Sequence, residues 1–501
     1  STTQGLHDFG VDFIQTIQQI EVYPGSSAAH FGTNAIGGAV NIILTGDYKD
    51  SLNLATDNSA NYEFFGNKAF IYDDSSLNIK IGSVQNETIS ARGNKSDEKD
   101  GLKNYSTNIN YEKFFNENLR IYNTVYLRQT KAEYDNSNTN QTGYEGDNKM
   151  GSLQFGLENQ IDAQKENYIF YYNIYDRKYD ERGTIDTYES EVLGLKYDLS
   201  RMINEKISFG AGSEYKYDWG YFDNKGSYEA STKGHSDNFA LYSNLGWNIF
   251  ENSNVSLFGR SDKHKQTGTN NTYKLNFEHG FEKFNLGISY MNGLRNPTLY
   301  EMFGTDNFGY SGNRNLKPEK SNTYEIYSNI AFNKNLNLTL RAFRANIQDN
   351  IEYISNKYQN DSDDVDLNQS GFNNNLNLKL KDSNINFFSS FLSSKKENRA
   401  DQLRRPEKNY GLNISQKIQS IFLGNFNINL AYNHYGKHFD THSSNFSTIE
   451  MDSTDIIDLK ITKKLSNSDF YIKVTNALDE TYQKPHGYNQ ENRVIKFGIK
   501  Y

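Results

Sequence analysis

Apolar and polar residues alternate along most of the chain, from about residue 51 to the last residue. Over residues 77–82, Leu and Ile alternate with Asn, Lys and Gly, and the same period of two returns over 336–341, 426–431, 470–475 and 495–501. Successive side chains of a β-strand point to opposite faces, so this pattern predicts strands with one apolar and one polar face. The chain is therefore predicted to be all-β.

Two architectures contain such strands, and the connections favour one of them. In a soluble sandwich the apolar faces pack together, whereas in a membrane barrel they face lipid and the polar faces line a wet lumen. Short turns at one end and long polar loops at the other are typical of an outer-membrane barrel. The short links are residues 333–335, 423–425 and 466–469, and the long links are residues 91–103, 136–148 and 358–371. We therefore expect a transmembrane antiparallel β-barrel.

Composition is compatible with a barrel and excludes several other classes. Hydrophobic residues make up 36% of the chain, and no run approaches the roughly 18 consecutive apolar residues of a membrane-spanning helix. The 37 Tyr and 32 Phe suit strands and membrane interfaces, and only 5 Pro suits a chain of hydrogen-bonded strands. The absence of Cys excludes disulfides and thiolate metal sites, and a net charge of −9 argues against nucleic acid as a partner.

Residues 20–43 form a glycine-rich segment with its own pattern. They predict a short strand, a turn at Gly25, one helical turn closed by Gly32, and a second strand after Gly37-Gly38. The segment matches neither a P-loop nor G-x-G-x-x-G, so it does not predict a nucleotide site.

This segment resembles the end of the plug domain of TonB-dependent outer-membrane receptors. In that family a strand, a Gly-containing turn, a Tyr/Phe-Gly pair, an Ile-Gly-Gly step and Asn-Ile-Ile follow in this order. One position departs, because the family usually has Arg before the turn glycine, where it commonly pairs with barrel carboxylates, and this chain has Pro24. The departure puts such a plug–barrel ion pair in question. The matching residues are Gly25, Gly32, Ile36, Gly37, Gly38 and Asn41.

Two later segments also resemble the family. Residues 295–326 resemble its mid-barrel signature, and residues 470–501, with their terminal aromatic, resemble its last two strands. In the first segment, Glu301 and Glu319 lie near Arg295, and they either hold the plug or form part of a charged lumen wall. The signature residues are Arg295, Pro297, Glu301, Pro318 and Glu319.

The resemblance implies an organisation for the chain. Residues 1–46 are assigned to the C-terminal part of a plug domain and residues 47–501 to the barrel. A tilted membrane strand takes about 9–11 residues. With connections averaging about 10 residues, the barrel holds about 22 strands, although length alone also permits about 18 or 20. The first plug strands and the TonB-contacting segment are expected to precede Ser1, so we expect the chain to be a fragment.

The resemblance also implies a function. Receptors of this family lie in the outer membrane of Gram-negative bacteria, among its lipids and lipopolysaccharide, and the TonB energy-transducing complex drives uptake. The expected ligand is a small organometallic compound or iron chelate, such as cobalamin or a ferric siderophore. No substrate bond is broken, so neither an enzyme nor a resident cofactor is expected. The alternatives are a haem or other metal-complex receptor, a passive porin-like channel and a soluble secreted β-protein.

Two groups of residues are candidate metal ligands. His434, His438 and His442 recur every four residues, and an outer loop that folds them together would suit a metal or haem. The acidic run containing Asp361, Asp363, Asp364 offers several carboxylates to calcium, although it lacks the spacing of an EF-hand loop. Both groups are also typical of solvated surface loops.

Overall fold

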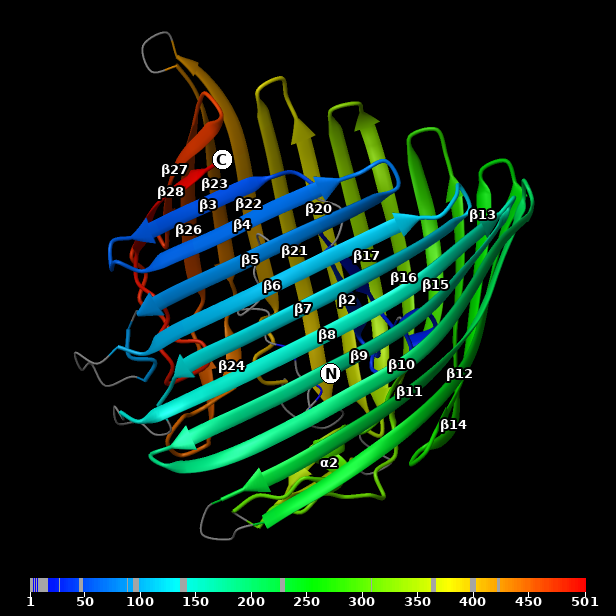
Figure 1. Ribbon diagram of the computed structural model, residues 1–501, viewed down its shortest axis with the longest axis horizontal. Helices are drawn as coiled ribbons and strands as arrows, with labels where there is room; N and C mark the ends of the chain where they lie inside the picture. The colour runs from blue at the N-terminus through cyan, green and yellow to red at the C-terminus, as the bar shows by residue number, and fades with distance from the viewer. Residues whose placement is uncertain are drawn as a thin grey trace.

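The computed structural model shows a closed antiparallel β-barrel (Figure 1). It describes residues 3, 5, 7, 17–26, 28–44, 48–87, 89–92, 99–135, 142–225, 230–307, 309–361, 366–396, 402–420 and 424–501. The barrel strands follow one another in chain order, and β28 pairs with β3 to close the ring. The prediction of a 22-stranded antiparallel barrel is confirmed.

The bounds of the barrel strands are β3 (Ser51–Asp57), β4 (Tyr62–Ile71), β5 (Ser75–Glu87), β6 (Gly101–Phe114), β7 (Leu119–Glu133), β8 (Tyr144–Ile161), β9 (Gln164–Glu181), β10 (Thr184–Asn204), β11 (Ile207–Asn224), β12 (Ala230–Phe250), β13 (Ser253–His264), β14 (Gly268–Gly280), β15 (Phe284–Arg295), β16 (Glu319–Asn333), β17 (Leu336–Gln348), β20 (Leu367–Lys379), β21 (Ser383–Lys396), β22 (Lys408–Ser420), β23 (Gly424–Tyr435), β26 (Thr454–Leu465), β27 (Ser468–Thr475) and β28 (Val494–Lys500). Two small hairpins, β18 (Ile351–Ile354) with β19 (Lys357–Asn360) and β24 (His438–Thr441) with β25 (Thr448–Met451), lie between barrel strands.

The two ends of the barrel differ in their connections. At one end, turns such as residues 162–163, 205–206 and 334–335 join neighbouring strands directly. At the other end, long connections carry the two small hairpins and the short helix α2 (Leu299–Phe303), which lies at the bottom of Figure 1. We call these the short-turn end and the long-loop end.

Each strand separates two environments, as its alternating sequence predicts. Along β16, Glu319, Ser321 and Thr323 are buried, whereas Lys320 and Tyr324, at alternate positions, are exposed. The polar face therefore points into the lumen and the exposed face points outward. Among the described residues, neither helix is long and apolar enough to cross a membrane.

A separate two-stranded sheet lies inside the ring of strands (Figure 1). It pairs β1 (Gln19–Pro24) with β2 (Gly38–Ile43), and the short helix α1 (Ala28–Phe31) sits between them. We call residues 17–44 the plug hairpin. The predicted domain boundary at residues 46 and 47 lies outside the described residues, so it stays a prediction.

Candidate functional site

The plug hairpin folds as its glycine pattern predicts. Gly25 and Gly32 have φ values of +74° and +87°, which L side chains rarely adopt. The Gly32 N–H donates to the Ala28 carbonyl at 2.9 Å and so closes α1. A Cβ on Gly38 would lie 2.6 Å from the Tyr23 carbonyl oxygen, so glycine is required where β2 starts against β1. Gly37, in contrast, faces open space.

Two other motif residues hold the hairpin together and against the wall. Asn41 Nδ2 donates to Glu21 Oε2 at 3.0 Å, directly across the β1–β2 pair. The Ile36 carbonyl accepts from Ser321 Oγ of β16 at 3.2 Å. Asn41 therefore stabilises the hairpin itself, whereas Ile36 anchors it to the barrel.

The contact between plug hairpin and barrel rests largely on backbone groups. Ser26 Oγ donates to the Asn292 carbonyl at 2.8 Å, and the Asn34 N–H donates to the Leu294 carbonyl at 2.9 Å. Within the described part of the chain, no ion pair links residues 17–44 to a barrel strand. Most of these bonds are between neutral groups, each of which contributes about 0.5–1.5 kcal/mol. The hairpin is therefore held by many weak contacts.

Glu325 shows how the barrel accommodates Pro24. A Cβ on Gly25 would lie 3.1 Å from Met291 Sδ and 3.7 Å from Glu325 Oε2, so this carboxylate sits beside the plug turn. Its other oxygen accepts from Arg341 Nη2 of β17 at 2.8 Å. The positive charge that balances Glu325 therefore comes from Arg341 of the barrel wall, because Pro24 of the plug carries no charge.

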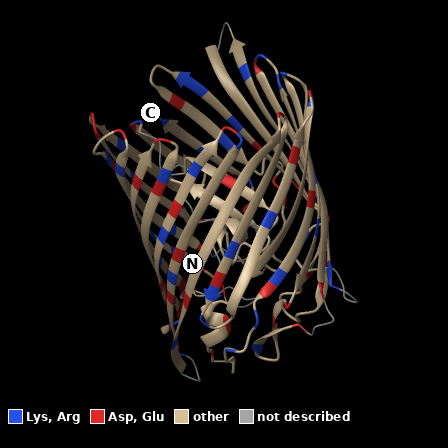
Figure 2. Cartoon of the chain, turned by 90° about the vertical axis from the view of Figure 1, so that its right-hand side faces the viewer, with Lys and Arg blue, Asp and Glu red and all other residues tan. Residues whose placement is uncertain are grey.

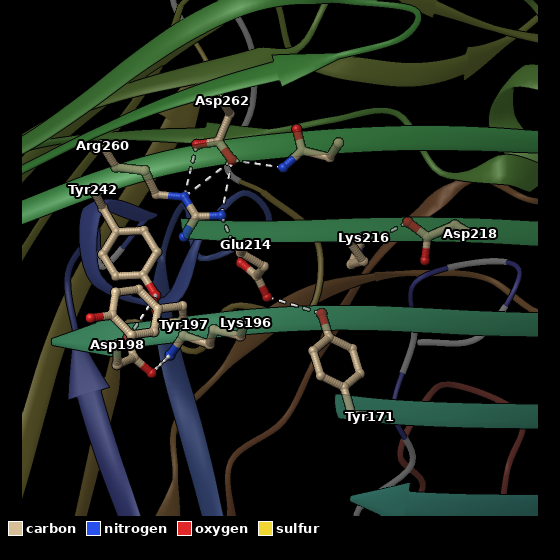
Figure 3. Close-up of polar contacts among 11 residues, drawn as sticks. Tyr171, Lys196, Tyr197, Asp198, Glu214, Lys216, Asp218, Tyr242, Arg260 and Asp262 are labelled. Carbon is tan, nitrogen blue, oxygen red and sulfur yellow. Dashed lines mark hydrogen bonds and ion pairs between the residues drawn. The ribbon is translucent and has the colours of Figure 1, made fainter. Parts of the chain in front are cut away.

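Gly32 rests on a second, more extensive ion-pair network. Figure 3 shows the residues of this network. A Cβ at this position would lie 3.1 Å from Arg260 Nη2. The same Nη2 binds Glu214 Oε2 at 2.8 Å, and Arg260 Nε binds Asp262 Oδ2 at 2.9 Å. The side chains of Arg260 and Asp262 are only 3% and 1% exposed, so both charges are buried and are balanced by protein groups. The helical turn of the plug thus sits on a buried guanidinium fixed by two carboxylates.

Neighbouring strands extend this network. Tyr171 OH donates to Glu214 Oε1 at 2.9 Å, and Tyr242 OH donates to Asp198 Oδ1 at 2.6 Å (Figure 3). Within strands, Lys196 pairs with Asp198 and Lys216 with Asp218, both at 3.0 Å. Figure 2 shows the same arrangement on a larger scale, with basic and acidic positions side by side on adjacent strands. This network was not predicted from the sequence, although opposite charges two residues apart on one strand face were a readable signal.

The mid-barrel signature forms a third ion-pair cluster. Arg295 Nε binds Glu319 Oε2 at 2.6 Å, and Arg295 Nη1 binds Glu301 Oε2 at 3.1 Å. Glu301 also accepts from the Thr298 N–H at 2.7 Å, and Thr298 Oγ1 accepts from the Glu301 N–H, a capping box that starts α2 after the buried Pro297. Each of these bonds joins groups of the barrel and its loops. The geometry therefore fits a charged lumen wall better than a clamp on the plug. Pro318 is buried directly before β16.

A model of the TonB-dependent receptor-like β-barrel matches residues 39–477. The chain belongs to the TonB-dependent receptor family. This receptor therefore lies in the outer membrane of a Gram-negative cell, with its short-turn end in the periplasm and its long-loop end outside.

Named relatives share part of its sequence. The vitamin B12 transporter BtuB of Photobacterium profundum is 25% identical over 343 residues, which is 65% of this chain and 53% of that protein. BtuB of Vibrio cholerae (strain O395) is 21% identical over 342 residues, covering 64% of this chain and 53% of that protein. The chain thus spans about half the length of the curated relatives that it matches.

Solved structures share the fold. The siderophore receptor PirA from Acinetobacter baumannii superposes with a TM-score of 0.85 at 16% identity, over 99% of this chain and 86% of that one. The copper transporter OprC superposes with a TM-score of 0.82 at 13% identity, over 98% and 86%. At these identities the likeness shows the fold alone.

An aromatic cluster covers part of the extracellular end of this receptor. Leu299 and Met302 of α2 pack on Phe222 of β11, and Tyr188 and Tyr300 pack around them. The cluster continues outward through further tyrosines, because the rings of Tyr310, Tyr353 and Tyr358 lie 5.2–5.8 Å apart. Burial raises the pKa of Tyr310, and its neutral hydroxyl donates to the Tyr300 carbonyl at 2.6 Å.

The candidate metal ligands have other partners. His434 Nδ1 binds Asp455 Oδ1 at 2.8 Å, His438 Nδ1 donates to the Gly436 carbonyl at 3.2 Å, and His442 Nδ1 accepts from the Ser444 N–H at 3.2 Å. In the acidic run, Asp361 Oδ2 accepts from the buried Lys396 Nζ at 2.5 Å. Asp363 and Asp364 lie outside the described residues. Among the residues that the structure describes, no group of three or more His, Cys, Asp or Glu is placed to hold a metal ion.

Proposed function

We propose that this receptor imports a scarce organometallic nutrient across the outer membrane, with energy supplied through TonB. The observation that carries the proposal is a plug hairpin seated in the lumen of a closed barrel. Uptake of this kind changes the position of the ligand and none of its bonds, so we infer that the chain is not an enzyme.

The way the plug hairpin is held suits displacement by force. The strong ion pairs at Arg260, Arg295 and Arg341 stay within the wall and its loops, and backbone hydrogen bonds of the Ser26 and Ile36 type join plug to wall. A pull on the plug therefore breaks mostly weak contacts and leaves the arginine–carboxylate pairs of the wall in place. Such a plug can move while the barrel stays intact.

Cobalamin is the ligand that we propose first. The support is the similarity to proteins named vitamin B12 transporters, which extends over 343 residues of aligned sequence. The aromatic cluster at the extracellular end offers flat apolar surfaces at Tyr353 and Tyr358 for a large, planar ligand. Ferric siderophores and haem are the competing ligands.

A growth experiment with the full-length gene tests the ligand. A deletion strain is grown on limiting cobalamin, ferric siderophore or haem, with the gene restored on a plasmid as the control. We expect growth on limiting cobalamin to require the gene. Normal growth of the deletion strain on cobalamin, together with loss of growth on an iron source, would replace cobalamin with that iron complex.

A bilayer experiment tests the plugged barrel against a passive channel. The full-length protein is inserted into a planar bilayer, and its conductance is compared with that of a porin. A plugged receptor is expected to be nearly closed, whereas stable porin-like openings would contradict the proposal.

A further inference from the structure

Three charged side chains from separate parts of the chain meet at the extracellular end of the barrel. Lys396 is the last residue of β21, Glu352 lies on β18, and Asp361 directly follows β19. Lys396 Nζ donates to Asp361 Oδ2 at 2.5 Å and also donates to Glu352 Oε1. One amine group therefore contacts two carboxylates, one on each arm of the small β18–β19 hairpin.

The three groups are largely closed to water. The side chains of Lys396 and Asp361 are 2% and 4% exposed, and that of Glu352 is 27% exposed. Among lysines that pair with a carboxylate inside the described part of the chain, the next least exposed is Lys496, at 22%. Burying an ion pair costs desolvation that the attraction of its charges often does not recover, so a buried pair favours transfer of a proton to the neutral form.

Lysine differs here from the arginines of the lumen wall. Arg260, Arg295 and Arg341 also bind carboxylates, but a guanidinium stays protonated and is not a nucleophile. A lysine ammonium that passes its proton to a carboxylate becomes an amine, which attacks carbonyl carbon. Lys396 thus places a nucleophile in direct contact with a carboxyl group.

Asn350 holds both carboxylates in position. Its backbone carbonyl accepts from the Asp361 N–H at 2.8 Å, and its Nδ2 donates to Glu352 Oε1 at 3.3 Å. The pairing of β18 with β19, which runs from Ile351 to Asn360 at the open end of the hairpin, fixes the two arms beside each other. Groups that are held in contact react far more readily than the same groups free in solution.

We propose that Lys396 and Asp361 are joined by an isopeptide bond, with Glu352 carrying the proton. Lys396 first passes one proton to Asp361, which gives a neutral amine and a carboxylic acid. Lys396 Nζ then attacks Asp361 Cγ, while Glu352 takes a proton from the nitrogen and returns it to the departing hydroxyl. A Cγ–N bond replaces a Cγ–O bond, and one water leaves. The reaction exchanges no electrons, so it needs neither an oxidant nor a reductant.

The bond has a structural consequence for the outer mouth of the receptor. It joins the β18–β19 hairpin covalently to the end of β21. The hairpin carries Tyr353 and Tyr358 of the aromatic cluster. An ion pair weakens with salt and with protonation, whereas an amide does not. The two rings therefore keep their place when the electrostatic conditions outside the cell change.

Peptide mapping of the purified full-length receptor tests the bond. The protein is denatured and digested with trypsin, and its peptides are analysed by mass spectrometry. Trypsin cleaves after free lysine and arginine. A bonded Lys396 therefore leaves residues 396–399 joined to residues 358–379 as one branched peptide. Its mass is the sum of the two peptides less one water, and fragmentation locates the branch.

Two variants change the site, and a third is the matched control. Lys396→Arg keeps the positive charge and removes the amine, and Glu352→Gln removes the proton carrier. The control is Lys437→Arg, because Lys437 also contacts two carboxylates, Glu450 at 3.1 Å and Asp452 at 3.4 Å, but is exposed to water. Heat-modifiable migration on a gel confirms that each variant is folded.

We expect the branched peptide in the natural protein and in Lys437→Arg, and we expect none in Lys396→Arg. Glu352→Gln should slow its formation about 100-fold, measured as the yield at fixed times after expression begins. Recovery of residues 358–379 only as an unbranched peptide from the folded natural protein would overturn the proposal. Equal yields in Glu352→Gln and the natural protein would overturn the role of Glu352. If a variant does not fold, the peptide map of the natural protein decides.

Discussion

Arginine side chains on the lumen face of strands β13 to β17 have carboxylate partners, whereas the arginine compared with them on the lipid face does not. On the lumen face, Arg260, Arg295 and Arg341 each bind a carboxylate at 2.6–2.9 Å. On the lipid face, Arg344 stands three residues from Arg341 and has no such partner in the described part of the chain. β17 thus carries one arginine paired with a carboxylate in the lumen and one exposed arginine on its outer face. The inner wall is therefore stabilised by ion pairs of its own, whereas Arg344 on the outer face forms none within the described part of the chain.

The largest effect is expected when Arg260 loses one of its two carboxylate partners. Asp262→Asn leaves a buried guanidinium with Glu214 as its remaining carboxylate, and removing one partner of a buried pair costs about 3–5 kcal/mol. We expect a loss of that size in urea-induced unfolding of the protein in lipid vesicles. The control is Ser261→Ala on the outer face of the same strand, expected to stay within about 0.5 kcal/mol. Unfolding of Asp262→Asn indistinguishable from this control would contradict the assigned role of the network.

A matched pair on β17 compares the two faces directly. Arg341→Gln leaves buried Glu325 without its cation, so we expect it to lower unfolding stability by about 1–3 kcal/mol. Arg344→Gln, on the exposed outer face, should change stability by less than about 1 kcal/mol. Both variants are measured by the same unfolding assay. Equal losses at the two positions would show that the faces do not differ as described.

The seating of the plug is tested at Gly32. A valine there meets Arg260 and must adopt a positive φ, which costs about 1–3 kcal/mol. We expect Gly32→Val in the full-length protein to increase deuterium exchange over residues 28–44 and to raise bilayer conductance. Gly37→Ala, at a position with open space, is the control and should change neither. An unchanged exchange rate in Gly32→Val would mean that the plug does not rest on Arg260.

The smallest expected effect is at the extracellular loops. Burial opposes ionisation of Asp440, but Arg404 and the N–H groups of His486 and Thr441 outweigh it, so the pKa of Asp440 is lowered. A lowered carboxylate pKa stabilises the loops above its unfolded value of about 3.9, and this contribution is lost as pH falls further. Arg404 is 57% exposed, so the effect should stay below about 1 kcal/mol. Deuterium exchange over residues 438–451 should rise below about pH 4 in the natural protein. In Asp440→Asn it should already be raised at neutral pH, and an identical pH profile in both proteins would refute the assignment.

The barrel could be predicted from the sequence because local rules determine it. Alternation with a period of two gives strand faces, and turn lengths distinguish the two ends. The plug hairpin could be predicted too, since Gly25, Gly32 and Gly38 stand where the backbone requires glycine. The capping box of Thr298 and Glu301 was readable from its spacing but was not predicted.

The partners across strands could not be predicted. Glu214 and Arg260 are 46 residues apart, and only the register of β11, β12 and β13 brings them together. For the histidines, the sequence left open a loop that folds them around one ion and separate surface positions, and the structure gives His434 and His438 separate hydrogen-bond partners.

Uptake of labelled cobalamin by cells that carry the full-length gene tests directly whether this receptor is plugged and driven by energy. The initial uptake rate is measured with a working TonB system and again after the proton gradient is collapsed. We expect binding at the cell surface to persist and accumulation in the periplasm to stop when the gradient is lost. Accumulation that continues without the gradient would contradict a plugged, energy-coupled receptor and would indicate a passive channel.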